Sequence, residues 1–112
     1  TYNIGGNNEW ANLDVVNLLC ELIDRRFADD KELAARFPDS PCAKGEPASS
    51  LISFVTDRPG HDTRYAINAA KISLELDYDP REDFDSGLNK TVDWYLENEQ
   101  WWRSIQDGSY RQ

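Results

Sequence analysis

The residues best suited to chemistry lie in one short stretch, which reads Asp57-Arg58-Pro59-Gly60-His61-Asp62-Thr63-Arg64-Tyr65. It places two arginines and the only histidine of the chain around a Pro-Gly turn. A guanidinium is a planar fork that binds phosphate oxygens in pairs, and an imidazole adds a donor near neutral pH. The pattern therefore predicts a diphosphate site. The alternative is an ordinary surface turn whose arginines pair with Asp57 and Asp62.

Asn12 is the second candidate, because it directly precedes a strongly helical pattern. Asparagine is a preferred N-cap, so a purely structural role is expected for it. A helix N-terminus also presents unpaired N–H groups and the positive end of the helix dipole, which favour an anion. Both roles can coexist at this position.

Several catalytic and cofactor motifs are missing from the chain. The six glycines form neither a dinucleotide-binding loop nor a phosphate-binding P-loop, and a single histidine excludes a histidine-pair metal site. A tyrosine followed four residues later by lysine, the pattern of a dehydrogenase base, does not occur either. We therefore expect this chain alone to catalyse no reaction.

The elements that must position the turn follow from hydrophobic spacing. Apolar residues at three- and four-residue steps from Leu13 to Phe27 predict a helix with a wide apolar face, which needs cover on two sides. Further helices are predicted over 69–76 and from Asp83 onward, with Asp83 as the cap. Short strands are predicted at 1–4, 51–56 and 64–68, and a mobile loop at 38–50. The expected fold class is a mixed α/β fragment of helices on a few short strands.

Composition and charge narrow the function further. The 112 residues suffice for one domain, and 12 basic against 21 acidic residues give a net charge of −9. This charge argues against nucleic-acid or anionic-membrane partners, and no segment is apolar enough to span a membrane. Two cysteines make no disulfide framework, so a reducing, cytoplasmic location is expected. The absence of methionine and the strand-like beginning suggest part of a longer protein.

Three motifs resemble the dTDP-glucose 4,6-dehydratase family. These are Tyr-Asn-Ile-Gly-Gly at the start with Asn12-Leu13-Asp14-Val15-Val16, then DRPGHD followed by RYAI at 57–67, then the Gly87–Leu96 stretch. They occur in the family's order and cover nearly the whole chain. DRPGHD with RYAI is fairly specific, whereas the other two are shared more loosely among sugar-nucleotide enzymes.

The resemblance implies that residues 1–112 form the C-terminal, substrate-binding lobe of an extended short-chain dehydrogenase/reductase. The parent enzyme would bind NAD through an N-terminal Rossmann domain absent from this chain. It would oxidise glucose C4, remove water across C5–C6 and return the hydride to C6, on the route to rhamnose and other deoxysugars. By analogy Asn12, Arg58 and His61 would contact the dTDP part of the substrate, and the parent would be a cytoplasmic homodimer.

The chain departs from the family pattern in three places. Asn68 stands where an Asp is usual, Asp77-Tyr78 replaces Gly-Trp, and the region 30–50 is longer than is common. None of these changes removes a proposed phosphate ligand. Two alternatives remain open: part of a UDP-sugar epimerase or decarboxylase, and a free-standing binding module with no catalytic domain.

Overall fold

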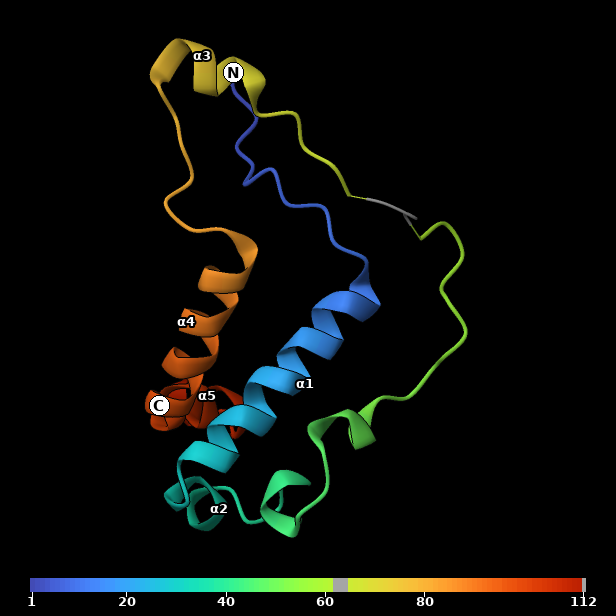
Figure 1. Ribbon diagram of the computed structural model, residues 1–112, viewed down its shortest axis with the longest axis vertical. Helices are drawn as coiled ribbons and strands as arrows, with labels where there is room; N and C mark the ends of the chain where they lie inside the picture. Colours follow the sequence, from blue (N-terminus) through green and yellow to red (C-terminus); the bar gives the residue numbers. More distant parts are fainter. Residues whose placement is uncertain (62–64, 112) are drawn as a thin grey trace.

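The computed structural model describes residues 1–61 and 65–111, and its regular elements in those ranges are all helical. Figure 1 shows α1 and α4 side by side, with α2 at one end of the pair and α3 beyond the other. The α-helices are α1 Asn12–Asp29, α2 Glu32–Arg36, α3 Ala70–Leu76, α4 Phe84–Glu97 and α5 Glu99–Gln106, and the 3₁₀ turns are η1 Cys42–Lys44, η2 Ala48–Leu51 and η3 Ser109–Arg111.

α1 confirms the helix predicted from the apolar spacing. Its covered side faces α4 on one flank and the η1–η2 segment on the other, so two neighbours cover part of the wide apolar face. Leu22, near the middle of α1, is 1% exposed and is the most completely buried large side chain among the described residues. Leu13 and Leu19 of the same helix remain partly exposed, so the apolar face is wider than this chain can cover.

α1 and α4 are joined at both ends. Trp10 stacks on Phe84 where the two helices begin, with ring centroids 4.7 Å apart. Near the far end the Arg26 guanidinium binds Asp93 through two hydrogen bonds of 2.6 and 3.1 Å, and its Nη2 also donates to the Asn89 side chain at 3.2 Å. The paired geometry of an arginine and a carboxylate fixes both distance and angle, so this contact sets how α4 lies on α1.

The Arg26–Asp93 pair predicts an acid-sensitive contribution to stability. The hydrogen bond from Arg26 lowers the pKa of Asp93, so the stabilisation is complete above the ordinary carboxyl pKa and is lost as pH falls through the lowered value. Because the Asp93 side chain is 46% exposed, solvent screening limits the effect to about 1 kcal/mol. Urea unfolding of Arg26→Ala should show this loss at pH 6 and much less at pH 3. The neighbouring, exposed Arg25→Ala is the control, and an equal loss in it would contradict the assignment.

The 38–50 segment, predicted to be a mobile loop, instead forms η1 and η2 and packs on α1. Asp24 of α1 anchors it, because its Oδ1 accepts hydrogen bonds from the Ala48 N–H at 2.7 Å and from Cys42 Sγ at 3.2 Å. Burial and the neighbouring Asp24 carboxylate raise the pKa of Cys42 to about 11, so this thiol stays protonated at neutral pH. Cys20 and Cys42 are both free thiols.

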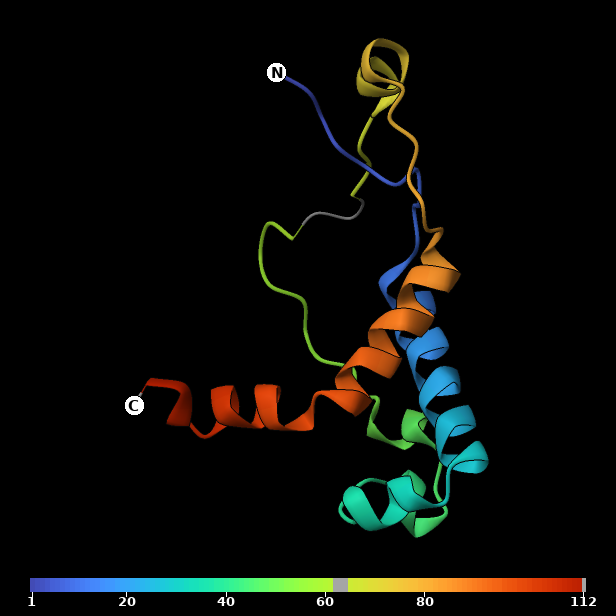
Figure 2. The same cartoon turned by 90° about the vertical axis from the view of Figure 1, so that its left-hand side faces the viewer.

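The C-terminal region was predicted as one helix and forms two. Asp83 caps α4 as expected, accepting from the Ser86 N–H at 2.7 Å, but the helix ends at Glu97 and α5 leaves in a new direction (Figure 2). At the bend the Trp102 indole N–H donates to the Tyr95 carbonyl at 2.9 Å, and the Asn98 side chain donates to the Trp94 carbonyl at 2.8 Å. Carbonyls freed at the end of α4 are therefore satisfied locally.

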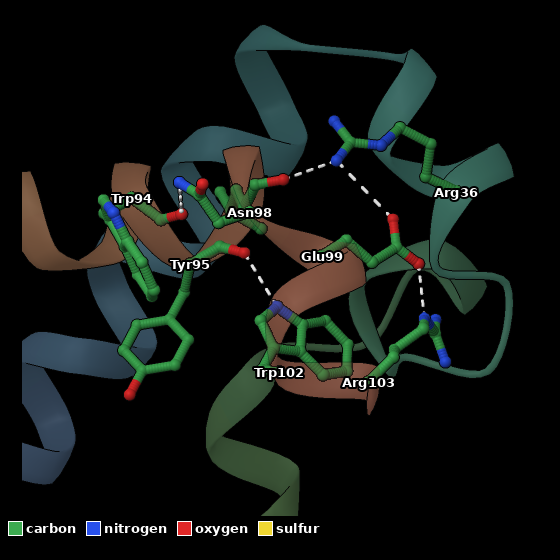
Figure 3. A network of polar contacts seen from close by, with 8 residues as sticks. Arg36, Trp94, Tyr95, Asn98, Glu99, Trp102 and Arg103 are labelled. Atoms are coloured by element: carbon green, nitrogen blue, oxygen red, sulfur yellow. Dashed lines mark hydrogen bonds and ion pairs between the residues drawn. The ribbon is translucent and has the colours of Figure 1, made fainter. Parts of the chain in front are cut away.

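Arg36 of α2 ties this bend to the rest of the fold (Figure 3). Its guanidinium donates to the Leu96 carbonyl and lies 3.6 Å from Glu99, which in turn accepts a 2.6 Å hydrogen bond from Arg103. The contact spans 60 residues of sequence, so a local pattern within 84–106 could not have indicated the break.

The first residues of the chain lie against α3, and the N-terminal segment then leads to the beginning of α1 (Figure 1). The Tyr2 hydroxyl donates to Glu75 at 2.8 Å, and Lys71 donates to the Thr1 carbonyl at 3.3 Å. A Cβ placed on Gly5 would lie 3.0 Å from Ile67 side-chain carbons, so the absence of a side chain at Gly5 allows this close approach. Segments far apart in the sequence thus meet here.

The predicted strands at 1–4 and 51–56 are wrong for this structure, which is helical with no strand in its described ranges. The third, at 64–68, begins outside those ranges, and its described part carries no strand either. A strand exists only when its backbone N–H and C=O groups pair with a neighbouring strand, and here no described neighbour offers that ladder. The mixed α/β architecture is therefore not confirmed.

The extended segments leave their apolar side chains uncovered. Phe54 and Val55 are 83% and 85% exposed. The radius of gyration is 17.8 Å, whereas a compact domain of about 100 residues has one near 13 Å. We define residues 52–61 together with 65–76 as the arm.

Across the ranges that the structure describes, none of the helices has the length and apolar character needed to cross a membrane.

Candidate functional site

The stretch 57–61 forms a tight turn closed by Asp57. The Asp57 Oδ1 accepts the Arg58 backbone N–H at 2.8 Å and contacts the His61 Nδ1 at 2.5 Å. The His61 N–H donates in turn to the Arg58 carbonyl at 3.3 Å. Gly60 has a φ of 73°, in the left-handed region where a side chain is strained, so glycine is required there for its backbone.

The charges in the turn leave the Arg58 guanidinium available to bind an anion. The hydrogen bond from His61, followed by that from the Arg58 N–H, lowers the pKa of Asp57, which is therefore an ionised acceptor. The Arg58 guanidinium is exposed and has no hydrogen-bond or ion-pair partner among residues 1–61 and 65–111. The expected alternative, in which Arg58 pairs with Asp57, is not what the structure shows, because His61 occupies that carboxylate.

Asn12 is the first residue of α1, not its N-cap. The cap position is Ala11, which has no side chain that can cap, and the first intrahelical bond runs from the Val15 N–H to the Ala11 carbonyl at 3.1 Å. The N-cap role predicted for Asn12 is therefore wrong. The backbone N–H groups of residues 12–14 precede that bond and have no intrahelical partner. The Asn12 side chain is exposed and has no partner among the described residues, so its amide can meet a ligand at this helix end.

The three predicted residues are only partly brought together. Arg58 and His61 share one turn, while Asn12 lies on a separate element. In both views the chain after η2 runs back along the length of the molecule toward the level at which α1 begins (Figures 1 and 2). Within the described part of the chain, no hydrogen bond or ion pair joins Asn12 to the turn. Asp62, Thr63 and Arg64 lie outside the described residues, as does the pairing expected of Asp62.

The sequence analysis did not predict the contact between Asp57 and His61. It predicted Asp57 only as a partner for an arginine, although Asp57 and His61 are four residues apart in the sequence. An Asp that opens a Pro-Gly turn commonly accepts hydrogen bonds from the backbone that follows it. Groups of three or more His, Cys, Asp or Glu side chains placed to hold a metal ion do not occur in the ranges described.

Comparison with known proteins gives the chain a consistent set of relatives. It is 49% identical over 99% of its length to dTDP-glucose 4,6-dehydratase of Neisseria meningitidis serogroup B, and 46% identical over 98% to that of Escherichia coli. It spans only 28% and 27% of those two proteins. No protein-family profile matches the chain.

A solved structure agrees with the sequence relatives. The chain matches dTDP-glucose 4,6-dehydratase from Bacillus anthracis, determined in complex with NAD, with a TM-score of 0.65 and 39% identity. The match covers 93% of this chain and 26% of that protein. Because the match leaves out only a small share of this chain, it includes most of the arm as well as the helices.

These findings make the chain similar to one part of sugar-nucleotide enzymes, of which it spans about a quarter of the length. More narrowly, the chain is homologous to the C-terminal part of dTDP-glucose 4,6-dehydratases. The DRPGHD turn, the beginning of α1 and the α4 region all fall inside the matched length.

Proposed function

We propose that this chain is the substrate-binding portion of an enzyme that converts dTDP-glucose to dTDP-4-keto-6-deoxyglucose by removing water. The observation that carries the proposal is the 57–61 turn, in which Arg58 is an exposed cation beside His61 with no partner among the described residues. The similarity to dTDP-glucose 4,6-dehydratases over 99% of the chain supports it. Residues 1–112 then act as one substrate-binding unit.

The contribution of these residues is positioning. Arg58 donates from its guanidinium fork to the diphosphate oxygens, His61 donates from its ring, and the Asn12 amide binds beside the free N–H groups that begin α1. The diphosphate is remote from the sugar carbons that react. Binding energy gained there holds the substrate equally before and during the reaction, and so lowers KM and raises kcat/KM.

NAD, which the Bacillus anthracis relative holds, does not fit the residues of this chain. The glycines lie at positions 5, 6, 45, 60, 87 and 108 and cannot form the phosphate-binding loop of a dinucleotide site. We propose that NAD binds to a part of the enzyme outside these residues. The exposed apolar side chains of the arm, Phe54 and Val55 among them, support the same division, because a larger partner surface would cover them.

The test uses the full-length protein that contains this chain, incubated with NAD and either dTDP-glucose or UDP-glucose. Mass spectrometry should show a product from dTDP-glucose that lacks one water, with slower turnover of UDP-glucose. A product of unchanged mass from UDP-glucose would instead support the epimerase alternative. Loss of carbon dioxide from a UDP-sugar acid would support a decarboxylase.

To distinguish a free-standing binding module from a portion of an enzyme, the chain itself is titrated with dTDP while backbone NMR shifts are followed. Saturable dTDP binding by the chain, with no dehydration of dTDP-glucose by the full-length gene product, would favour a binding module over an enzyme. The homodimer and the cytoplasmic location implied by the resemblance stay predictions, as does the absence of nucleic-acid and membrane partners. Sedimentation of the full-length protein would test the homodimer.

A further inference from the structure

One carboxylate oxygen organises both candidate ligands of the turn. The Asp57 Oδ1 lies 2.8 Å from the Arg58 backbone nitrogen and 2.5 Å from the His61 Nδ1. Asp57 therefore fixes the backbone that carries the Arg58 guanidinium and, separately, the ring of His61. Asp57 thus orients the His61 ring and holds the backbone from which the Arg58 side chain extends.

The contact also decides which ring nitrogen of His61 faces outward. An ionised carboxylate can only accept hydrogen bonds, so the proton of this contact belongs to Nδ1. Nδ1 is then occupied, and Nε2 is the nitrogen left for a ligand. Once the ring carries its second proton, Nε2 donates to a phosphate oxygen. A carboxylate that orients a histidine in this way is a recurring device in binding and catalytic sites.

Charge argues that Asp57 is not itself a ligand. A carboxylate repels the diphosphate that Arg58 and His61 are proposed to bind, so its presence in the turn weakens binding unless it contributes indirectly. The Asp57 side chain is 71% exposed and the His61 side chain 40%. Neither is part of the buried core, so Asp57 acts within the turn and does not support the fold.

We propose that Asp57 is a positioning residue, which holds His61 through Nδ1 so that Nε2 is presented to the diphosphate of the substrate. This inference rests on the proposed function, because it assumes that His61 binds that diphosphate. The inference goes beyond the proposed function because it assigns a role to Asp57, whose negative charge would repel the diphosphate in direct contact.

The test is a double-mutant cycle in the full-length enzyme with dTDP-glucose as the substrate. Asp57→Asn keeps an oxygen that can accept the Arg58 N–H, so the turn stays closed while the charged partner of His61 is lost. We expect KM to rise about fivefold with kcat changed less than about twofold. In a His61→Ala background the same substitution should change KM less than about twofold, because the ring it positions is gone.

The cycle separates failure of the inference from failure of the proposed function. If His61→Ala leaves KM unchanged, the proposed role of His61 is wrong and the inference falls with it. If His61→Ala raises KM but Asp57→Asn does not, or lowers it through reduced repulsion, only the positioning role is overturned. Equal effects of Asp57→Asn in both backgrounds would also overturn it, since they would show that Asp57 closes the turn without acting through His61. Asp57→Glu should restore KM at least in part, because it returns a charged acceptor.

Discussion

Truncating Leu22 to alanine is expected to lower the free energy of unfolding of this chain by about 3 kcal/mol. Leu22 is 1% exposed and lies on α1, the helix that packs against both α4 and the η1–η2 segment. Removing its side chain loses buried apolar contact and leaves a cavity in the core. Few described residues are buried to this degree, so the substitution weakens a small core. In urea, the helical circular dichroism signal of the variant should therefore be lost at lower concentrations than that of the unsubstituted chain.

Leu19→Ala is the matched control, because it makes the same change on the same helix at a side chain that is 39% exposed. Its effect should stay below about 1 kcal/mol. If the two variants unfold at the same urea concentration, Leu22 does not occupy the centre of the core. The alanine itself does not weaken the helix, since alanine is the best helix former.

The sequence was sufficient to predict those parts of the fold whose signals are local. The three- and four-residue spacing from Leu13 to Phe27 predicted α1, and Asp83 predicted the cap and beginning of α4. A local signal failed where a distant contact decides the structure. The division of α4 from α5 involves the Leu96 carbonyl and Arg36, which lie 60 residues apart.

The strand predictions failed for a different physical reason. Residues 51–56, Leu-Ile-Ser-Phe-Val-Thr, have the apolar and β-branched composition of a strand, yet Phe54 and Val55 are almost fully exposed. A strand is completed by its neighbours, so composition identifies a segment able to pair but not the presence of a partner.

The candidate site was predictable in residue type and less so in arrangement. The arginine, the histidine and the Pro-Gly pair indicated anion binding by their types and spacing alone, and the turn forms with Gly60 in the left-handed region. Which side chain would form a hydrogen bond with the Asp57 carboxylate depended on distances inside the turn. The N-cap predicted for Asn12 failed by one position, which leaves its amide exposed.

Replacing Arg58 with alanine is expected to raise KM for dTDP-glucose in the full-length enzyme by about 10- to 100-fold. The reason is the loss of paired, charge-assisted hydrogen bonds to the diphosphate, since the Arg58 guanidinium has no competing partner among the described residues. Steady-state kinetics would measure the change. Arg58→Lys should give an intermediate KM, because it keeps the charge and loses the planar fork.

Arg25→Ala provides the control for charge alone. Arg25 is exposed on α1, and its removal changes the net charge by the same amount as the loss of Arg58. Long-range attraction of a dianionic substrate would weaken equally in the two variants, whereas a direct contact predicts an effect at Arg58 only. If the Arg58→Ala and Arg25→Ala enzymes have the same KM, the Arg58 guanidinium does not contact the diphosphate. The 57–61 turn would then be an ordinary surface turn, and residues outside this chain would have to recognise the diphosphate.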